Sequence, residues 1–88
     1  MSHAPEVPDP RRKRLLWRAT HRGIKEMDIV FGGFVTAGLA RFTDAELCEL
    51  EVMIEIPDQQ LLSWATRQES VPAQQATPLL KAMLSHRP

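Results

Sequence analysis

The chain has 88 residues, of which 43% are hydrophobic and 25% charged, the balance of an ordinary globular protein. A chain of this length makes one small domain of modest stability, because it buries only about 60–65% of the surface that its unfolded form exposes. The longest stretch without a charge, residues 29–40, is shorter than the ~20 apolar residues that cross a bilayer, so we expect no membrane span.

The formal net charge is zero, but the charges are unevenly distributed. Residues 1–25 hold seven Lys and Arg against two Asp and Glu, whereas residues 26–88 hold four against nine. Nucleic-acid binding needs a basic face with groove-reading or stacking elements. The one basic run, RRKR at residues 11–14, is equally consistent with a solvated helix start, so we expect no nucleic-acid partner.

Cys48 is the single cysteine, so the chain forms no internal disulfide and no cysteine-based zinc cluster. Because this cysteine stands inside an apolar helical pattern, we interpret it as a small core residue in a protein of a reducing compartment.

The N-terminal sequence, MSHAPEVPDP, has neither the apolar core of a signal peptide nor the composition of a transit peptide. This favours a bacterial cytoplasm, or a mature form whose leader has been removed. Residues 1–9 are rich in proline and polar side chains and are expected to form a disordered arm. Residues 10–86 are then the folded domain.

Two helices are predicted in the first half of the domain. Asp9 and Pro10 supply an N-cap and a first helical position, and the helix is expected to run through residue 22 and to stop at Gly23. From Ile24 the apolar residues recur at i, i+3 and i+4, which predicts a second helix. Its adjacent glycines at 32–33 indicate either the close approach of another helix or a bend.

Three shorter helices are predicted in the second half. Thr43 and Glu46 have the spacing of a capping box, so a helix should begin at Asp44. The prolines at 57 and 78 mark the starts of two more, expected at residues 58–68 and 78–86. The other face of the third helix carries carboxylates for which no basic partner is expected: Glu46, Glu49, Glu51 and Glu55.

Helices this short are unstable alone and must pack together. No segment alternates with period two, so no strand is expected. We therefore predict an all-α fold, a small single-domain five-helix bundle. The expected core consists of the apolar residues on the inner helix faces: Leu15, Leu16, Ala19, Met27, Val30, Phe31, Phe34, Val35, Leu39, Leu47, Leu50, Met53, Ile54, Leu61, Leu62, Trp64, Ala65, Leu79, Leu80, Met83 and Leu84.

Motifs of catalytic sites are absent from the sequence: it has no GxGxxG after a strand, no Walker lysine loop, no HExxH and no GxSxG. The three histidines, His3, His21 and His86, are too scattered to indicate a metal site. We therefore expect that the protein is not an enzyme, with no catalytic residues and no bound metal.

The charged stretch HRGIKEMD, residues 21–28, is more informative. By spacing alone, Arg22 and Glu26 are as consistent with an ordinary surface ion pair, worth a few tenths of a kcal/mol, as with a functional site. Gly23 leaves the backbone uncovered between them, and an arginine fork beside bare backbone and a carboxylate makes a compact polar docking surface. Trp17, in the basic first helix, is either a core residue or an exposed anchor for a partner.

The stretch RGIKEMD, residues 22–28, resembles the RGxxE signature of the succinate dehydrogenase assembly factors that promote flavin attachment. The resemblance extends over about residues 11–85. The order of elements also matches: a basic first helix, the signature, an apolar second helix, an acidic third helix opened by a capping box, and a DxxLLxW-like stretch at 58–64. The sequence departs from the family at His21, where arginine is common, and at FGGF, residues 31–34, where leucines are usual.

The resemblance implies a five-helix bundle that binds the flavoprotein subunit of succinate dehydrogenase, and in some bacteria that of fumarate reductase. Such a factor assists covalent linkage of FAD to a histidine of that subunit and holds no cofactor stably itself. We expect it to be a monomer. Carried over by position, the partner-binding residues are Arg22, Gly23 and Glu26, with Asp28 as an extension, although Asp28 is also consistent with a local cap or a pair with Lys25. To this set we add two residues that the family pattern does not supply: His21, next to the signature, and Trp17, as a candidate anchor.

Two other functions stay open from the sequence. One is a regulatory protein-binding module of another kind, such as an antitoxin-like or cytoskeleton-directed partner. The other is direct flavin carriage, in which the contact with FAD would be weak and shared with the partner, since the chain has no recognisable dinucleotide fold.

Overall fold

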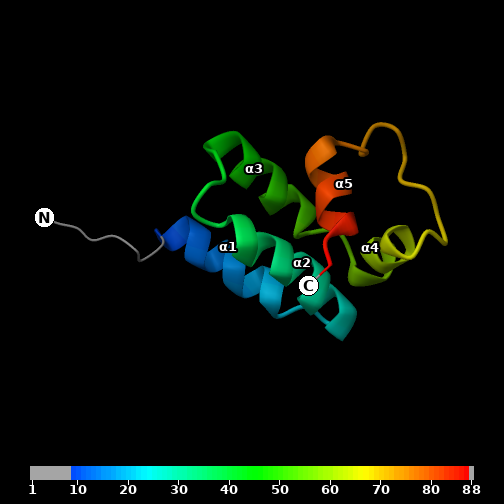
Figure 1. Ribbon diagram of the computed structural model, residues 1–88, viewed down its shortest axis with the longest axis horizontal. Coiled ribbons are helices and arrows are strands. Elements are labelled where there is room, and N and C mark those ends of the chain that lie inside the picture. Colours follow the sequence, from blue (N-terminus) through cyan, green and yellow to red (C-terminus); the bar gives the residue numbers. More distant parts are fainter. Residues whose placement is uncertain (1–8, 88) are drawn as a thin grey trace, which may run out of the picture.

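The computed structural model describes residues 9–87, which form five helices (Figure 1). The helices are α1 (Pro10–Thr20), α2 (Lys25–Gly38), α3 (Asp44–Met53), α4 (Asp58–Ala65) and α5 (Pro78–Ser85). No strand occurs among the described residues, which confirms the predicted all-α, single-domain bundle. None of these helices is long and apolar enough to cross a bilayer. The predicted arm lies outside the described residues, apart from Asp9.

Three helices begin where their capping residues predict. The carboxylate of Asp9 accepts a hydrogen bond from the N–H of Arg12 at 2.8 Å, and the hydroxyl of Thr77 accepts one from Leu80 at 3.1 Å. At α3, Thr43 and Glu46 form the full reciprocal capping box, with bonds of 2.8 and 3.1 Å. These starts follow from local sequence because each cap satisfies backbone N–H groups within one helical turn.

Three helices end earlier than the sequence predicts. α5 ends one residue early, at Ser85, while α1 ends at Thr20 rather than residue 22 and α4 at Ala65 rather than residue 68. At the ends of α1 and α4, a threonine hydroxyl donates to a carbonyl four residues back: Thr20, the last residue of α1, to Leu16, and Thr66, directly after α4, to Leu62, each at 2.8 Å. Such side-chain bonds compete with the next backbone bonds and favour termination.

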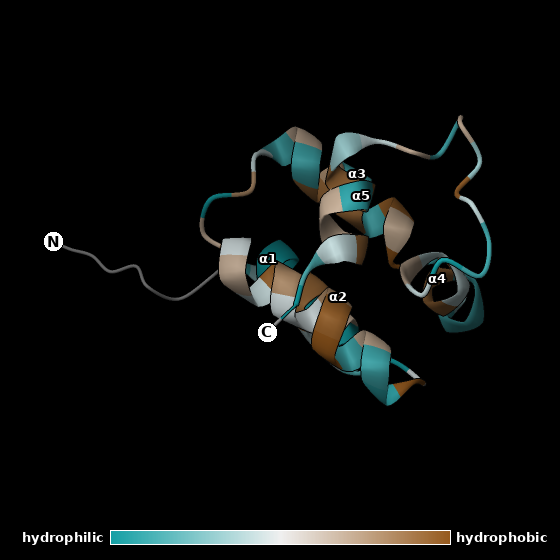
Figure 2. Ribbon diagram, turned by 45° about the vertical axis from the view of Figure 1, so that its right-hand side comes forward, coloured by the Kyte–Doolittle hydropathy of each residue, from teal (hydrophilic) through white to brown (hydrophobic). Residues whose placement is uncertain are grey.

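α2 is the central helix and packs against α1, α4 and α5, while α3 packs against α1 and α5 (Figure 1). The first turn of α2 is hydrophilic and the middle of α2 is hydrophobic (Figure 2). A Cβ at Gly32 would lie 2.9 Å from Cγ2 of Thr20 and 3.1 Å from the carbonyl oxygen of Ala19. The glycine therefore permits the close approach of α1, the first of the two alternatives that the sequence left open.

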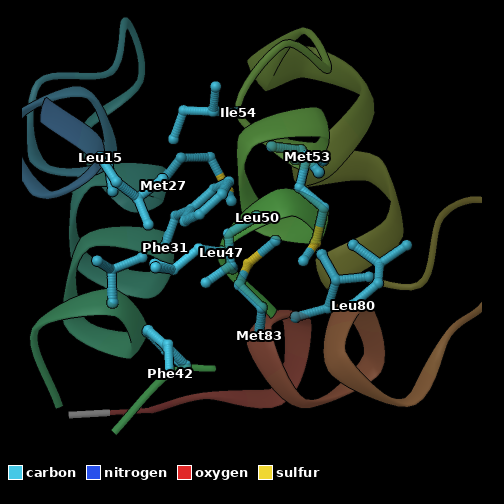
Figure 3. Close-up of a cluster of buried hydrophobic side chains, with 14 of the residues drawn as sticks. Leu15, Met27, Phe31, Phe42, Leu47, Leu50, Met53, Ile54, Leu80 and Met83 are labelled. Atoms are coloured by element: carbon cyan, nitrogen blue, oxygen red, sulfur yellow. The ribbon is translucent and has the colours of Figure 1, made fainter. Parts of the chain in front are cut away.

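The core lies between α2, α3 and α5 and is closed by α1 and α4 (Figure 3). Among the buried apolar side chains of residues 9–87, only Phe42 was not predicted from the sequence, because it lies in the α2–α3 connection rather than on a helix face. The buried apolar residues are Leu15, Ala19, Met27, Phe31, Val35, Phe42, Leu47, Leu50, Met53, Ile54, Leu61, Trp64, Leu80, Met83 and Leu84. The other predicted core residues are partly buried against this cluster.

Two predictions about α3 are wrong. Cys48 is exposed rather than part of the core. Two of the four carboxylates predicted to lack a basic partner have one, because Arg11 on α1 binds Glu51 at 2.9 Å and Arg18 binds Glu55 at 2.8 Å. Among residues 9–87, Glu46 and Glu49 form no ion pair, as predicted. The two ion pairs arise only when α1 packs beside α3.

Candidate partner-docking site

The signature arginine lies at the turn between α1 and α2, with its side chain directed into the fold. Its Nε donates to Oδ1 of Asp58 at 2.6 Å, while Nη1 and Nη2 donate to the carbonyl oxygens of Ile54 and Ile56, each at 2.8 Å. The guanidinium also lies 5.2 Å from the ring centroid of Phe31. With a side chain only 8% exposed, Arg22 ties the α1–α2 turn to the α3–α4 turn.

The backbone of this turn is held by carboxylates. The N–H groups of Gly23 and Ile24 donate to Oδ2 of Asp58 at 2.6 and 3.2 Å, and the N–H of Arg22 donates to Oδ1 of Asp28 at 2.5 Å. α2 has no side-chain cap on its N-cap residue, Ile24. Asp58 on α4 and Asp28 on α2 instead fix the backbone that leads into the helix, where negative charge is also favoured by the helix dipole.

Gly23 and Glu26 are exposed to solvent, unlike the side chain of Arg22. No hydrogen bond or ion pair joins Glu26 to another residue in the range 9–87. The surface ion pair between Arg22 and Glu26 is not formed, since Arg22 pairs with Asp58. The signature is therefore divided: Arg22 and Asp28 stabilise the turn from within, while bare backbone at Gly23 and the carboxylate of Glu26 face solvent.

Trp17 and His21 extend this open surface along the end of α1. Their rings are stacked, with centroids 4.2 Å apart and planes 10° from parallel, and Nδ1 of His21 lies 2.8 Å from the carbonyl oxygen of Trp17. Trp17 is 61% exposed, whereas Trp64 is buried in the core as predicted. The stacked pair borders a shallow hollow of about 240 Å³ lined by Trp17, Arg18, His21, Arg22, Gly23, Ile54 and Asp58.

We call Trp17, His21, Gly23 and Glu26 the docking surface. It combines a planar aromatic pair, uncovered backbone and a carboxylate that has no hydrogen-bond or ion-pair partner among residues 9–87. Asp58 was not among the site residues predicted from the sequence. Two signals were available, since Asp58 follows a proline at a helix start and opens the DxxLLxW-like stretch, but its partner Arg22 stands 36 residues away in the chain.

Comparison with known proteins identifies the family. Residues 13–87 match the family model described as flavinator of succinate dehydrogenase. The chain is similar to the FAD assembly factor SdhE of Acetobacter pasteurianus, with 43% identity over 74 residues, which are 84% of this chain and 68% of that protein. It is also similar to the mitochondrial succinate dehydrogenase assembly factor 2 of Dictyostelium discoideum, with 29% identity over 75 residues, and to that of Scheffersomyces stipitis, with 35% over 66.

The aligned residues cover 85% of this chain against the Dictyostelium protein and 75% against the Scheffersomyces protein, but only 53% and 44% of those two proteins. The chain thus spans about two thirds of the bacterial relative and about half of the mitochondrial ones. The family match covers all five helices except the first three residues of α1, and it includes the whole signature. The chain belongs to the family of succinate dehydrogenase flavinators, the assembly-factor family that its RGxxE signature resembles.

Proposed function

We propose that this protein binds the flavoprotein subunit of succinate dehydrogenase and promotes the covalent attachment of FAD to that subunit. The observation that carries the proposal is the match of residues 13–87, signature included, to a family of flavinators, together with the similarity of 74 residues to a bacterial FAD assembly factor. The exposed part of the signature agrees with a binding role, because Glu26 has no hydrogen bond or ion pair among residues 9–87, and Gly23 is exposed although its N–H donates to Asp58.

The docking surface offers three kinds of contact to such a partner. Gly23 lets a partner backbone approach closely, because no side chain covers it. Glu26 can accept charge-assisted hydrogen bonds from a basic side chain or from backbone N–H groups. Trp17 presents a large planar apolar surface, of the type found at interface hot spots. Together they make a face that binds a folded protein rather than a small ligand.

In this proposal the protein is not an enzyme, and the FAD belongs to its partner. The factor acts by stabilising the conformation of the flavoprotein in which flavin attachment proceeds. A binding protein can shift a conformational equilibrium only by its difference in affinity for the two states. The docking surface must therefore fit the competent conformation better than the alternatives.

In-gel flavin fluorescence of the denatured flavoprotein tests the proposal. Host cells that lack this protein are compared with cells restored with the wild type, with Glu26→Ala, or with the matched control Asp44→Ala. Asp44 is a 94% exposed carboxylate at the start of α3, away from the docking surface. We expect fluorescence to fall in the deletion strain, to return with wild type and Asp44→Ala, and to stay low with Glu26→Ala. Unchanged fluorescence in the deletion strain would refute the proposed function.

The proposal includes three finer points, each with its own measurement. The same fluorescence assay on the flavoprotein of fumarate reductase tests whether that subunit is a second client. Light scattering during size-exclusion chromatography tests the expected monomer. Cell fractionation tests the expected location in a bacterial cytoplasm, in keeping with the similarity to a bacterial factor.

A further inference from the structure

The contacts of Asp58 point to a role for a residue outside the RGxxE signature. We propose that Asp58 is a positioning residue of the docking surface, which holds the α1–α2 turn in the shape that presents Gly23 and Glu26 to the partner. This inference rests on the proposed function, since it assigns a further residue to the same site. Asp58 acts through Arg22 and the turn backbone, not by touching the partner itself.

Both oxygens of the Asp58 carboxylate are occupied within the fold. Oδ1 accepts from Nε of Arg22 at 2.6 Å, and Oδ2 accepts from the N–H groups of Gly23 and Ile24 at 2.6 and 3.2 Å. The side chain is 14% exposed, so little of it is accessible to a partner. The Asp58 carboxylate thus binds three consecutive residues of the turn, residues 22–24. The N–H of Gly23, whose backbone is exposed, is one of its donors.

Loss of this charge is expected to lower stability, as loss of Arg22 does, and to change the structure chiefly at the turn. The Arg22 side chain is 8% exposed, and without Asp58 its charge would face only the carbonyl dipoles of Ile54 and Ile56 and the ring of Phe31, with no carboxylate. A buried charge without a counter-ion is unfavourable and moves toward water. Met27 and Phe31 are fully buried and hold the inner face of α2 in the core, so the rearrangement stays at the junction.

Because both oxygens of Asp58 accept hydrogen bonds, the substitution Asp58→Asn tests the role of this carboxylate with little change of shape. Asn has nearly the shape of Asp, but one of its two terminal atoms is an NH₂ donor instead of an acceptor. At position 58 both terminal atoms face donors, the guanidinium on one side and two backbone N–H groups on the other. Whichever way the amide is turned, one donor group of the turn loses its acceptor.

Calorimetric titration with the purified flavoprotein subunit of succinate dehydrogenase tests the inference. Wild type, Asp58→Asn, Glu26→Gln and the control Glu51→Gln are compared at a temperature where all four are folded by circular dichroism. Glu51→Gln removes one charge from an ion pair of α1 and α3 outside the docking surface. Hydrogen exchange of the amides of Gly23 and Ile24 is measured on the same samples.

We expect Asp58→Asn to raise Kd about tenfold or more, as it would if the competent turn conformation fell to about a tenth of the population. Exchange at Gly23 and Ile24 should become faster in this variant alone. The Kd of Glu51→Gln should stay within about twofold of the wild-type value, because the Glu51 carboxylate does not contact the α1–α2 turn. If Asp58→Asn does not fold, Asp58→Glu keeps the charge but displaces it by one methylene, and the same increase in Kd is expected.

Three results would overturn the inference, and they can be told apart. Wild-type affinity in Asp58→Asn together with weak binding by Glu26→Gln would exclude a positioning role and leave the proposed function intact. Equal weakening in Asp58→Asn and Glu51→Gln would assign the effect to general stability. No binding by the wild type would refute the proposed function and the role of Asp58 with it.

Discussion

Arg22 and Asp58, 36 residues apart in the chain, form an ion pair in which the two side chains are only 8% and 14% exposed. The pair joins the turn before α2 to the turn before α4, and the same carboxylate accepts from the backbone of Gly23 and Ile24. The signature arginine is therefore part of the folded framework, while Glu26 is exposed. A substitution of Arg22 and a substitution of Glu26 test different properties of the protein.

Arg22→Ala is expected to lower the free energy of unfolding by about 3 kcal/mol, because removing one partner of a buried ion pair leaves the other uncompensated. Glu26→Ala should change it by no more than about 0.5 kcal/mol, as for other exposed residues without partners. Urea unfolding followed by circular dichroism measures both. Equal stability of the two variants would contradict the structural role of Arg22.

Trp17→Ala is expected to weaken binding to the flavoprotein by about 2 kcal/mol, because an exposed tryptophan beside a hollow has the properties of an interface hot spot. Its stability should stay within about 0.5 kcal/mol of wild type, since Trp17 is 61% exposed. Val52→Ala on α3 is the matched control, because Val52 is 69% exposed and does not border the hollow. Titration calorimetry should separate the two variants, and similar affinities would place the partner contact elsewhere.

Gly32→Ala is expected to destabilise the protein by about 1–3 kcal/mol, even though alanine normally favours a helix over glycine. The added Cβ would lie 2.9 Å from Cγ2 of Thr20 and 3.1 Å from the backbone oxygen of Ala19, and the helix backbone cannot move aside easily. Gly33→Ala is the control. Its Cβ would meet the imidazole of His86 at 2.9 Å, and this side chain near the end of α5 can rotate away.

Thermal unfolding of both glycine variants measures the difference. Gly33→Ala should be neutral or more stable than wild type by up to about 1 kcal/mol, the helix preference of alanine. A stabilised Gly32→Ala would show that α1 and α2 do not pack as closely as the structure has them.

The α1–α3 ion pair predicts a pH dependence of stability. Hydrogen bonds from Arg11 hold the pKa of the Glu51 carboxyl below its ordinary value of 4.5. A carboxyl whose pKa is lower in the folded state stabilises the fold above its unfolded pKa, and this contribution is lost as the pH falls through the folded pKa. Wild type should therefore lose more stability below about pH 4.5 than Glu51→Gln, which has no such carboxyl.

Chemical unfolding at a series of acidic pH values checks this difference. Because Glu51 is partly exposed, added salt should reduce the contribution of its ion pair. Parallel pH curves for the wild type and Glu51→Gln would mean that the pair contributes nothing to folding.

The sequence by itself determined where most helices begin and which faces are buried. Asp9, Thr43 and Thr77 cap their helices through bonds to residues three positions on, and such bonds need no other part of the chain. Apolar residues at helical spacing predicted the whole buried core except Phe42. The signature and the order of the elements also identified the family that the comparisons confirm.

Only the tertiary structure decided what the charged residues do. Arg22 could have faced Glu26 one turn away, but a long side chain binds whichever partners the packing brings within reach. Here these are Asp58 and the carbonyls of Ile54 and Ile56. Packing likewise pairs Glu51 and Glu55 with Arg11 and Arg18 of α1. It also leaves Cys48 exposed. Hydrophobic periodicity is a local property of one helix, whereas ion pairs between helices depend on their packing, which no single segment encodes.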